Sequence, residues 1–386
     1  MAVNAKSTPK IEPTPANAGR ANRSGIALAG LAAAAGLTLL LATGCSLSEE
    51  GKADTTKPAA TTQVQSFGGV GSTFVDPLFT YWSSDYAKGH QVQINYRAIG
   101  SGAGMSELKR GNPTFAVTDA PLDDTQLKDY PQLLQVPITA GPVCVTYNIP
   151  GVTTALRLSS KTLAGIFAGD IISWQDSAIA SENPGVKLPH AAIIVVHRTD
   201  GSGTNFIFTS YLSSVSPDWS KKIGHGVSVK WPAGIGAEGS GNVLNLVRNN
   251  PGTITYLELN FAKRAGLPVA LIQNKAGEYV TPSPKSAELA VSAFSDTLEK
   301  DLRAPIVDPP ASAKGAYPIS GMSYVLVPVD DSVVGNRKAF KDFLEYTISA
   351  GQEASEELSY AKLPIAIQQR GDALLNEMTD NGKPIQ

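Results

Sequence analysis

Residues 193–212 read I-I-V-V-H-R-T-D-G-S-G-T-N-F-I-F-T-S-Y-L, and this stretch limits the folds open to the chain more than any other. The β-branched run at 193–196 is typical of a strand buried on both faces of a parallel sheet. The glycines and serine within residues 199–203 are typical of a tight turn. The apolar spacing from Thr204 then predicts a capped amphipathic helix. The stretch therefore predicts a strand that passes through a tight turn directly into a helix.

The start of this helix is a candidate anion-binding site. Backbone N–H groups of a first helical turn lack partners within the helix, and the helix dipole is positive at that end. The hydroxyls of Ser202 and Thr204 add donors. The planar guanidinium of Arg198, at the end of the strand, suits a phosphate or a carboxylate. We therefore expect an oxyanion to bind at this loop.

Other interpretations of the loop remain open. A nucleotide-binding phosphate loop needs G-x-x-x-x-G-K-[ST], and no lysine stands at the required place. A nucleophile elbow needs G-x-S-x-G, but Asp200 and Thr204 occupy the outer glycine positions around Ser202. An exported serine hydrolase or phosphatase that uses Ser202 is therefore a second hypothesis. The third is an ordinary turn beside a chance arginine, and only a recurrence of the pattern argues against it.

The pattern does recur in the preceding part of the chain. Residues 68–77 (G-G-V-G-S-T-F-V-D-P) lead into apolar positions at helical spacing. Residues 91–99 alternate as a strand, and G-S-G-A-G at 100–104 precedes a second helical segment. Residues 115–117 form a short strand that ends at Thr118 and Asp119, before Pro121. The recurrence of these strand-to-helix transitions favours a binding site over ordinary turns.

The rest of the chain continues to alternate between strand and helix patterns, which predicts α/β architecture. The aromatic residues Phe340, Phe343 and Tyr346 are expected in the core. The four histidines are too scattered to predict a metal site, and we expect no cofactor. Strands are predicted at 143–147, 252–257 and 324–328, and helices at 161–168, 287–302, 340–349 and 365–378.

The N-terminal segment has the pattern of an export signal. Four basic residues (Lys6, Lys10, Arg20 and Arg23), without a run of acids, precede an apolar stretch at 25–43, which Gly44 and Cys45 close. We expect residues 1–44 to be a signal peptide and Cys45 to be the lipidated first residue of the mature chain. The lipoprotein pattern is imperfect because Ala42 stands where leucine is preferred. An uncleaved signal anchor is the alternative, since the apolar stretch is nearly long enough to span a bilayer.

Residues 46–65 are rich in Ser, Thr, Lys, Pro and Ala, so we expect a flexible tether between Cys45 and the folded part. The other cysteine, Cys144, lies in an apolar run and is predicted to be a core residue. The length of 386 residues suits about two domains, and a formal net charge of −2 does not point to nucleic acid.

Four motifs together resemble one family. They are S-T-F at 72–74, I-G-S-G at 99–102, T-D-A-P-L at 118–122 and R-T-D-G-S-G-T at 198–204. In this order they resemble the phosphate-binding protein of the high-affinity phosphate ABC transporter. The resemblance extends over essentially the whole mature chain, including V-K-W-P at 229–232 and Y-P-I-S at 317–320.

The resemblance implies a two-lobed periplasmic-binding-protein fold of type II, in which the ligand binds in a cleft between lobes that close on a hinge. The first lobe would comprise residues 66–142 and 317–386, and the second residues 143–316. Asp200 would pair with Arg198. By the same resemblance, the phosphate shell comprises Ser72, Thr73, Phe74 through its backbone N–H, Ser101, Asp119, Arg198, Ser202, Gly203 and Thr204.

The expected function is therefore capture of inorganic phosphate for import, without catalysis. The expected partners are phosphate, the permease subunits with their cytoplasmic ATPase, and the membrane through the lipid anchor. The protein should act as a monomer on the extracytoplasmic face of a bacterial cytoplasmic membrane, periplasmic or cell-surface. A receptor for another oxyanion, such as sulfate or molybdate, is a further alternative.

Overall fold

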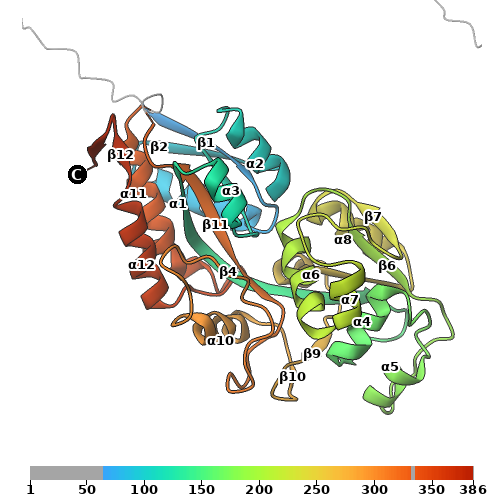
Figure 1. Ribbon diagram of the computed structural model, residues 1–386. Coiled ribbons are helices and arrows are strands. Elements are labelled where there is room, and N and C mark those ends of the chain that lie inside the picture. The colour runs from blue at the N-terminus through green and yellow to red at the C-terminus, as the bar shows by residue number, and fades with distance from the viewer. Residues whose placement is uncertain (1–63, 332–334, 386) are drawn as a thin grey trace, which may run out of the picture. The chain divides into compact units, whose positions relative to one another are not determined.

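The computed structural model of the chain describes residues 64–331 and 335–385 (Figure 1). The predicted signal peptide, Cys45 and all but the end of the predicted tether lie outside these residues. The strands are β1 (Gln65–Gly71), β2 (Val92–Ala98), β3 (Phe115–Thr118), β4 (Leu133–Asn148), β5 (Arg157–Leu158), β6 (Ile194–Arg198), β7 (Ile235–Ala237), β8 (Thr253–Glu258), β9 (Leu271–Gln273), β10 (Tyr279–Val280), β11 (Ser320–Pro328), β12 (Thr379–Asp380) and β13 (Lys383–Pro384).

Helices alternate with most of these strands, as the sequence predicts. They are α1 (Asp76–Ala87), α2 (Ser101–Lys109), α3 (Asp124–Asp129), α4 (Ser160–Ala168), α5 (Ser177–Glu182), α6 (Gly203–Val215), α7 (Pro217–Lys222), α8 (Gly239–Asn249), α9 (Leu259–Arg264), α10 (Pro284–Phe294), α11 (Arg337–Ile348) and α12 (Ile365–Leu375), with a 3₁₀ turn at Ala350–Ala354. The predicted α/β class is confirmed.

The main sheet has eight strands in the order β2-β1-β3-β11-β4-β8-β6-β7. Strands β1, β2 and β3 run parallel to one another, and so do β6, β7 and β8. The antiparallel strands β11 and β4 lie between these two groups. The sheet is therefore mixed, with a parallel set of strands on either side of its centre.

Strand β4 joins the two sets because it is 16 residues long and buried over almost its whole length. Its first part, Leu133–Pro142, pairs with β11, and its second part, Val143–Asn148, pairs with β8. The sequence analysis predicted only residues 143–147 as a strand here. Cys144, 0% exposed, lies in the core as predicted.

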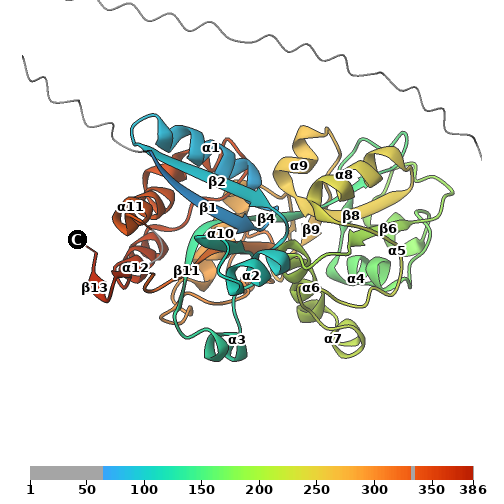
Figure 2. The same cartoon turned by 90° about the horizontal axis from the view of Figure 1, so that it is seen from above.

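Each parallel set of strands packs against its own aromatic cluster. Phe79 stacks against Tyr96 and Phe115 on the side of β1–β3. Phe208 and Trp231 stack on Tyr256 on the side of β6–β8. Figure 2 shows α1 beside β1 and β2, and α8 beside β8, so helices cover the sheet at both ends. This packing fixes the strand ends from which the site is built.

Several predicted boundaries are wrong. The helix predicted to reach Leu302 ends at Phe294, because Ser295 and Thr297 turn their hydroxyls onto the last-turn carbonyls and compete with the helical hydrogen bonds. Leu302 itself has a positive φ of 61°. Strand β6 is not fully buried on both faces either, because Ile194 is 38% exposed. Helices α3, α5, α7, α8 and α9 were not predicted.

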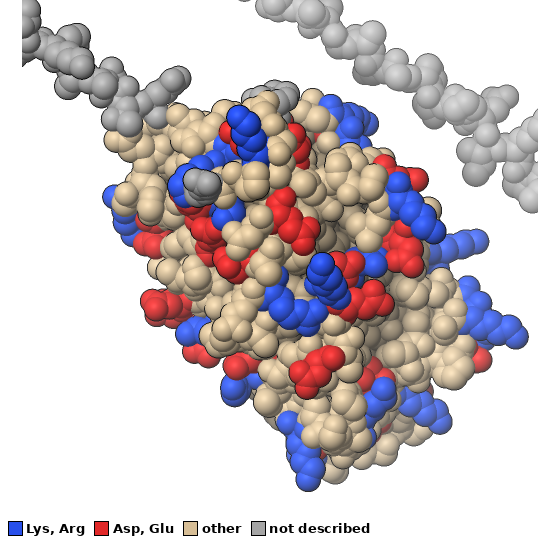
Figure 3. Space-filling model, turned by 60° about the vertical axis from the view of Figure 1, so that its left-hand side comes forward, with Lys and Arg blue, Asp and Glu red and all other residues tan. Residues whose placement is uncertain are grey.

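The surface carries charges of both signs. On the face shown in Figure 3, basic and acidic side chains are interspersed, without a broad basic patch. Among residues 64–331 and 335–385, no helix is long and apolar enough to cross a membrane. The same residues hold no group of three or more His, Cys, Asp or Glu side chains that could bind a metal ion.

Candidate anion-binding site

The candidate site gathers residues from the carboxyl ends of six strands. Ser72 and Thr73 follow β1, Ser101 follows β2, and Asp119 follows β3. From the other parallel set, Arg198 ends β6, Ser240 follows β7, and Glu258 ends β8. In open α/β sheets, ligands bind at carboxyl strand ends, where helix N-termini also lie. The two parallel sets run in opposite directions, so their carboxyl ends face each other across the site.

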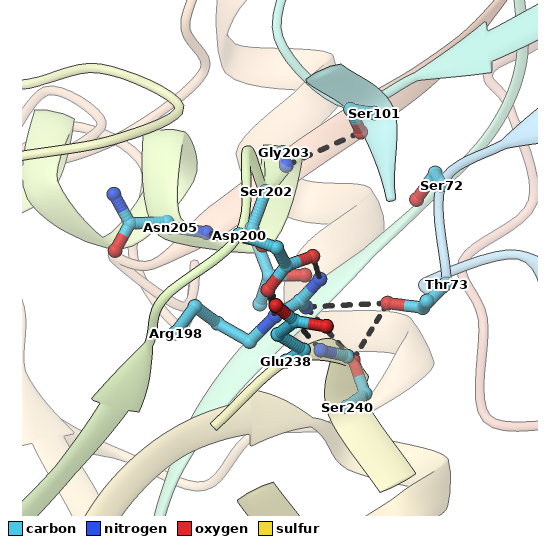
Figure 4. A network of polar contacts seen from close by, with 12 residues as sticks. Ser72, Thr73, Ser101, Arg198, Asp200, Ser202, Gly203, Asn205, Glu238 and Ser240 are labelled. Carbon is cyan, nitrogen blue, oxygen red and sulfur yellow. Dashed lines mark hydrogen bonds and ion pairs between the residues drawn. The ribbon is translucent and has the colours of Figure 1, made fainter. Parts of the chain in front are cut away.

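Arg198 lies at the centre of the network (Figure 4). The residue is 4% exposed, and its Nε and Nη2 atoms donate to the two carboxylate oxygens of Asp200 at 2.7 and 2.5 Å. Its Nη1 donates to the hydroxyls of Thr73 at 3.2 Å and Ser240 at 3.1 Å. The backbone N–H of Gly239 also donates to Asp200, at 3.1 Å. The predicted pairing of Asp200 with Arg198 is present, and it holds the guanidinium plane in a fixed orientation.

Burial alone would raise the pKa of the Asp200 carboxyl, but the hydrogen bonds and charge of Arg198 outweigh it and lower that pKa. Burial likewise acts against the charged form of Arg198, yet Asp200 raises the guanidinium pKa. Both groups are therefore ionised at neutral pH, and most of the positive charge of Arg198 is balanced within the protein.

Asp119 is the second buried carboxylate of the site, at 2% exposed. One of its oxygens accepts a hydrogen bond from the Ser72 hydroxyl at 2.5 Å, and the other accepts one from the Ser323 hydroxyl at 2.7 Å. Burial raises the pKa of Asp119 to about 7, although these two hydrogen bonds act in the opposite direction. Burial therefore favours the neutral form of this carboxyl far more than it would for an exposed aspartate.

The N-termini of α2 and α6 meet directly beside Asp119. The backbone N–H of Gly203 donates to the Ser101 hydroxyl at 3.2 Å, and the N–H of Gly102 donates to the carbonyl of Gly201 at 2.9 Å. A Cβ atom on Gly203 would lie 2.4 Å from the Asp119 carboxylate. Only glycine allows this helix start to approach the carboxylate so closely.

Three residues of the predicted shell also form hydrogen bonds within the protein. Ser202, not Thr204, caps α6, because its hydroxyl accepts from the backbone N–H of Asn205 at 3.1 Å. The Thr204 hydroxyl donates to Glu258 at 2.6 Å. The backbone N–H of Phe74 donates to the Ser72 hydroxyl at 3.0 Å. The Ser202 hydroxyl still has its hydrogen to donate, whereas those of Thr204 and Ser72 are already donated to Glu258 and Asp119.

The sequence analysis missed three members of the network. Ser323 lies on β11, and nothing local in its sequence marks it. Ser240 follows G-A-E-G at 236–239, a glycine and hydroxyl pattern before a helix that repeats the signal at residues 100–104. Glu258 ends a buried strand, as Asp119 nearly does. The last two could have been found from the sequence.

The hydrolase hypothesis gains no support from the geometry around Ser202. Its hydroxyl caps a helix, as described above, and its backbone N–H donates to the carbonyl of Val227. The nearest histidine in sequence, His197, points its Nδ1 to the carbonyl of Arg198 and stacks on Trp231. Within residues 64–331 and 335–385, no hydrogen bond joins a histidine to Ser202.

Comparisons with known proteins agree with this architecture. The family model described as the PBP superfamily domain matches residues 56–350. The phosphate-binding protein PstS of Xylella fastidiosa (strain Temecula1) is 37% identical over 337 residues, which cover 85% of this chain and 92% of the relative. PstS of Methanocaldococcus jannaschii is 38% identical over 307 residues, which cover 73% of this chain and 78% of the relative.

Solved structures show the same fold at lower identity. A high-affinity periplasmic phosphate-binding protein, PfluDING with bound phosphate, has a TM-score of 0.63 at 21% identity and covers 83% of this chain and 100% of its own. A putative phosphate ABC transporter substrate-binding protein from Clostridium perfringens, also with bound phosphate, has a TM-score of 0.57 at 18% identity, with 78% and 100% covered. Together with the sequence identities, these matches show that the chain belongs to the PstS family of phosphate-binding proteins, within the PBP superfamily.

Proposed function

We propose that this chain captures inorganic phosphate outside the cytoplasm and delivers it to an ABC importer. Membership of the PstS family supports this function, and so does a site that combines a buried arginine with the N-termini of α2 and α6, which meet from the two parallel sets of strands. Such a site favours a small tetrahedral oxyanion that accepts hydrogen bonds on every side.

The observation that carries the proposal is the buried carboxyl of Asp119 beside the Gly203 helix start. A carboxylate opposite a fully deprotonated oxyanion leaves two acceptors facing each other without a proton, which costs several kcal/mol. Phosphate carries at least one O–H near neutral pH and can donate it to Asp119, whereas sulfate has none. Since Arg198 would bind either anion, Asp119 is the group that favours phosphate.

The proposed phosphate shell follows from the groups that converge between the two sets of strand ends. Backbone N–H groups at the start of α6 and the hydroxyls of Ser101 and Ser202, which accept hydrogen bonds from backbone N–H groups and keep their own hydrogens, would donate to phosphate oxygens. Arg198 would supply the positive charge, held in place by Asp200. The proposed shell is Ser72, Thr73, Phe74, Ser101, Asp119, Arg198, Ser202, Gly203 and Thr204.

We further propose that two lobes close over phosphate by hinge bending, with β4 as one crossing. The change of its pairing partner between Pro142 and Val143 supports a boundary there. The sequence analysis put the return crossing near Tyr317. However, α10 packs against β4 and β11, and Arg370 of α12 donates to the carbonyls of residues 295 and 298. These contacts favour a return before Pro284, with residues 284–316 in the first lobe.

The chain would bind and release phosphate without a chemical step, and its partners would be the permease subunits of the importer. We propose that it acts as a monomer at the outer face of the cytoplasmic membrane, anchored through a lipidated Cys45. The sequence pattern before Cys45 supports this anchor.

Calorimetric titration of a protein that begins at Ser66 tests the function directly. Phosphate should bind one to one, arsenate should compete with it because it also carries an O–H, and sulfate should bind far more weakly. Tight sulfate binding would favour the other-oxyanion alternative. Turnover of p-nitrophenyl phosphate that disappears in Ser202→Ala would instead favour the hydrolase hypothesis.

A further inference from the structure

A buried tyrosine outside the proposed shell holds the turn at residues 72–74. Tyr360 is 1% exposed, and its hydroxyl donates to the backbone carbonyl of Phe74 at 2.5 Å. The same hydroxyl accepts a hydrogen bond from the side-chain amide of Asn260, through Nδ2, at 2.7 Å. The direction of both hydrogen bonds is fixed, because a carbonyl can only accept and a hydroxyl has a single hydrogen. Tyr360 therefore links Asn260 to the backbone of Phe74.

Tyr360 lies beside the proposed crossing between the lobes. The N–H of the next residue, Ala361, donates to the carbonyl of Ala140 in β4 at 2.8 Å. The rings of Phe74 and Tyr360 are 5.6 Å apart. A Cβ atom on Gly141 would lie 2.8 Å from the Phe74 ring and 3.6 Å from the Tyr360 ring. Both rings therefore pack directly on β4, just before this strand changes its pairing partner.

The two partners of the Tyr360 hydroxyl belong to different proposed lobes. Phe74 and Tyr360 lie in the first lobe, whereas Asn260 is the second residue of α9, in the second lobe. Hinge bending at β4 would move Asn260 relative to Tyr360, while Tyr360 and Phe74 move together. Because a hydrogen bond weakens steeply away from its normal distance and angle, the contact from Asn260 depends on the angle between the lobes.

The backbone that Tyr360 holds is part of the proposed phosphate shell, since the N–H of Phe74 is one of its donors. Helix α1 follows this turn, and its N-cap residue, Val75, makes no capping hydrogen bond with its side chain. Two tyrosine hydroxyls hold the turn instead. Tyr96 donates to the carbonyl of Ser72 at 2.8 Å, and Tyr360 donates to that of Phe74. The Tyr360 hydroxyl also reaches the second lobe.

Packing alone does not explain Asn260. The residue is 6% exposed, and its Oδ1 atom is buried without a hydrogen-bond partner in the described part of the chain. An unpaired amide oxygen in the interior costs free energy, which an apolar side chain of similar size would avoid. The hydrogen bond that Nδ2 donates to Tyr360 offsets this cost, so this contact is the reason for an amide at position 260.

We propose that Tyr360 is a positioning residue that couples closure of the lobes to the phosphate-binding turn through Asn260. This inference rests on the proposed function. In the closed protein, Asn260 donates to the Tyr360 hydroxyl and polarises it, which strengthens its hydrogen bond to the Phe74 carbonyl. The backbone that carries the Phe74 N–H is then held firmly. Opening breaks the contact from Asn260 and loosens the turn.

The test compares the parent with Tyr360→Phe, Asn260→Ala, their double variant and a control, Tyr147→Phe. Calorimetry measures the Kd for phosphate, and urea denaturation without phosphate measures the free energy of unfolding. The control is matched because Tyr147 is 0% exposed and its hydroxyl also has two partners. It donates to the carbonyl of Thr154 at 2.8 Å and accepts from the N–H of Leu156 at 2.9 Å, all within the second lobe.

Tyr360→Phe should weaken phosphate binding by about tenfold, and Asn260→Ala by about threefold to tenfold, which is the range for one buried hydrogen bond. The double variant should bind phosphate as Tyr360→Phe does, because the amide has no partner left to lose once the hydroxyl is gone. Tyr147→Phe should lower stability about as much as Tyr360→Phe does, yet keep the parent Kd within about twofold.

Two results would overturn the proposal for Tyr360 alone. One is a Tyr360→Phe protein that loses stability but keeps the parent Kd, as expected of an ordinary core residue. The other is a double variant whose loss of affinity is the product of the two single losses, because the residues would then act independently. If Tyr360→Phe does not fold, an unchanged Kd in Asn260→Ala would overturn the proposal. A parent protein that binds no phosphate would overturn the proposed function itself.

Discussion

Asp119→Asn should change how the stability of the ligand-free protein depends on pH. Burial raises the pKa of Asp119 from 3.8 to about 7, so the folded protein holds this proton more tightly than the unfolded chain. Between these two pKa values the unfolded chain has lost the proton and the folded protein has kept it. The free energy of unfolding therefore falls as pH rises through this window.

The pKa difference sets the size of the effect. At about 1.4 kcal/mol per pKa unit, a carboxyl with a pKa of about 7 in the folded state and 3.8 in the unfolded state costs about 4 kcal/mol above neutral pH. The asparagine cannot ionise and avoids this cost, but it disturbs the hydrogen bonds from Ser72 and Ser323, a loss of about 1–3 kcal/mol. Asp119→Asn should thus be less stable than the parent at low pH and as stable or more stable above neutral pH.

Urea denaturation of both proteins in phosphate-free buffer, from about pH 4 to about pH 8, measures this difference. All other ionisable groups are shared, so the difference between the two curves reports on position 119. Curves that stay parallel across the range would refute the reasoning, because burial would then impose no penalty on the carboxylate.

The same substitution should alter anion selectivity. The asparagine amide can donate to either anion, so phosphate affinity should fall modestly and the phosphate-to-sulfate ratio should narrow. Sites that require one specific hydrogen bond can bind the analogue that lacks it about 10⁴ to 10⁵ times more weakly. The phosphate-to-sulfate affinity ratio can therefore fall by up to that factor in Asp119→Asn. If calorimetry found a loss of stability with the ratio intact, Asp119 would be a turn residue before Pro121.

Three further predictions follow from the geometry and the sequence. Gly203→Ala should lower the free energy of unfolding by about 1–3 kcal/mol and weaken phosphate binding, because the new Cβ would lie 2.4 Å from Asp119. Gly241→Ala in α8, where no atom lies near the added Cβ, is the control and should change neither quantity in denaturation and titration assays. Phosphate at a thousandfold excess over Kd should stabilise the folded protein by about 4 kcal/mol, and a melting temperature indifferent to phosphate would contradict binding. Cys45→Ala should abolish membrane association in cell fractionation, or leave an unprocessed precursor, without changing phosphate affinity; a changed affinity would show that the anchor and the site are coupled.

Much of the site could be predicted from the sequence because its signals are local. A β-branched run, a glycine and hydroxyl turn and an apolar helix follow one another within residues 193–212, and similar transitions recur after β1 and β2. Each of them orders its own backbone, so the strand end and the helix start were predicted together. That the strand ends of the two parallel sets face each other depends on the fold, because the sets run in opposite directions along the two halves of β4.

The missing parts depend on contacts between distant segments. Ser323 donates to Asp119 across 204 residues, and nothing local in the sequence marks it. Ser240 and Glu258 carry a local signal, but their contacts with each other and with Thr204 are formed only in the fold. The end of α10 was missed for the opposite reason. Apolar spacing continues to Leu302, but local hydroxyls at residues 295 and 297 end the helix first.

A crystal structure of the phosphate complex tests the central claim most directly, through the distance from the Asp119 carboxylate to the nearest phosphate oxygen. The account predicts a short O–H···O contact of about 2.5–2.7 Å, with Arg198 and the backbone N–H of Gly203 donating to other phosphate oxygens. A phosphate bound with no oxygen within hydrogen-bond distance of Asp119 would contradict the claim that this carboxylate selects the anion by its proton.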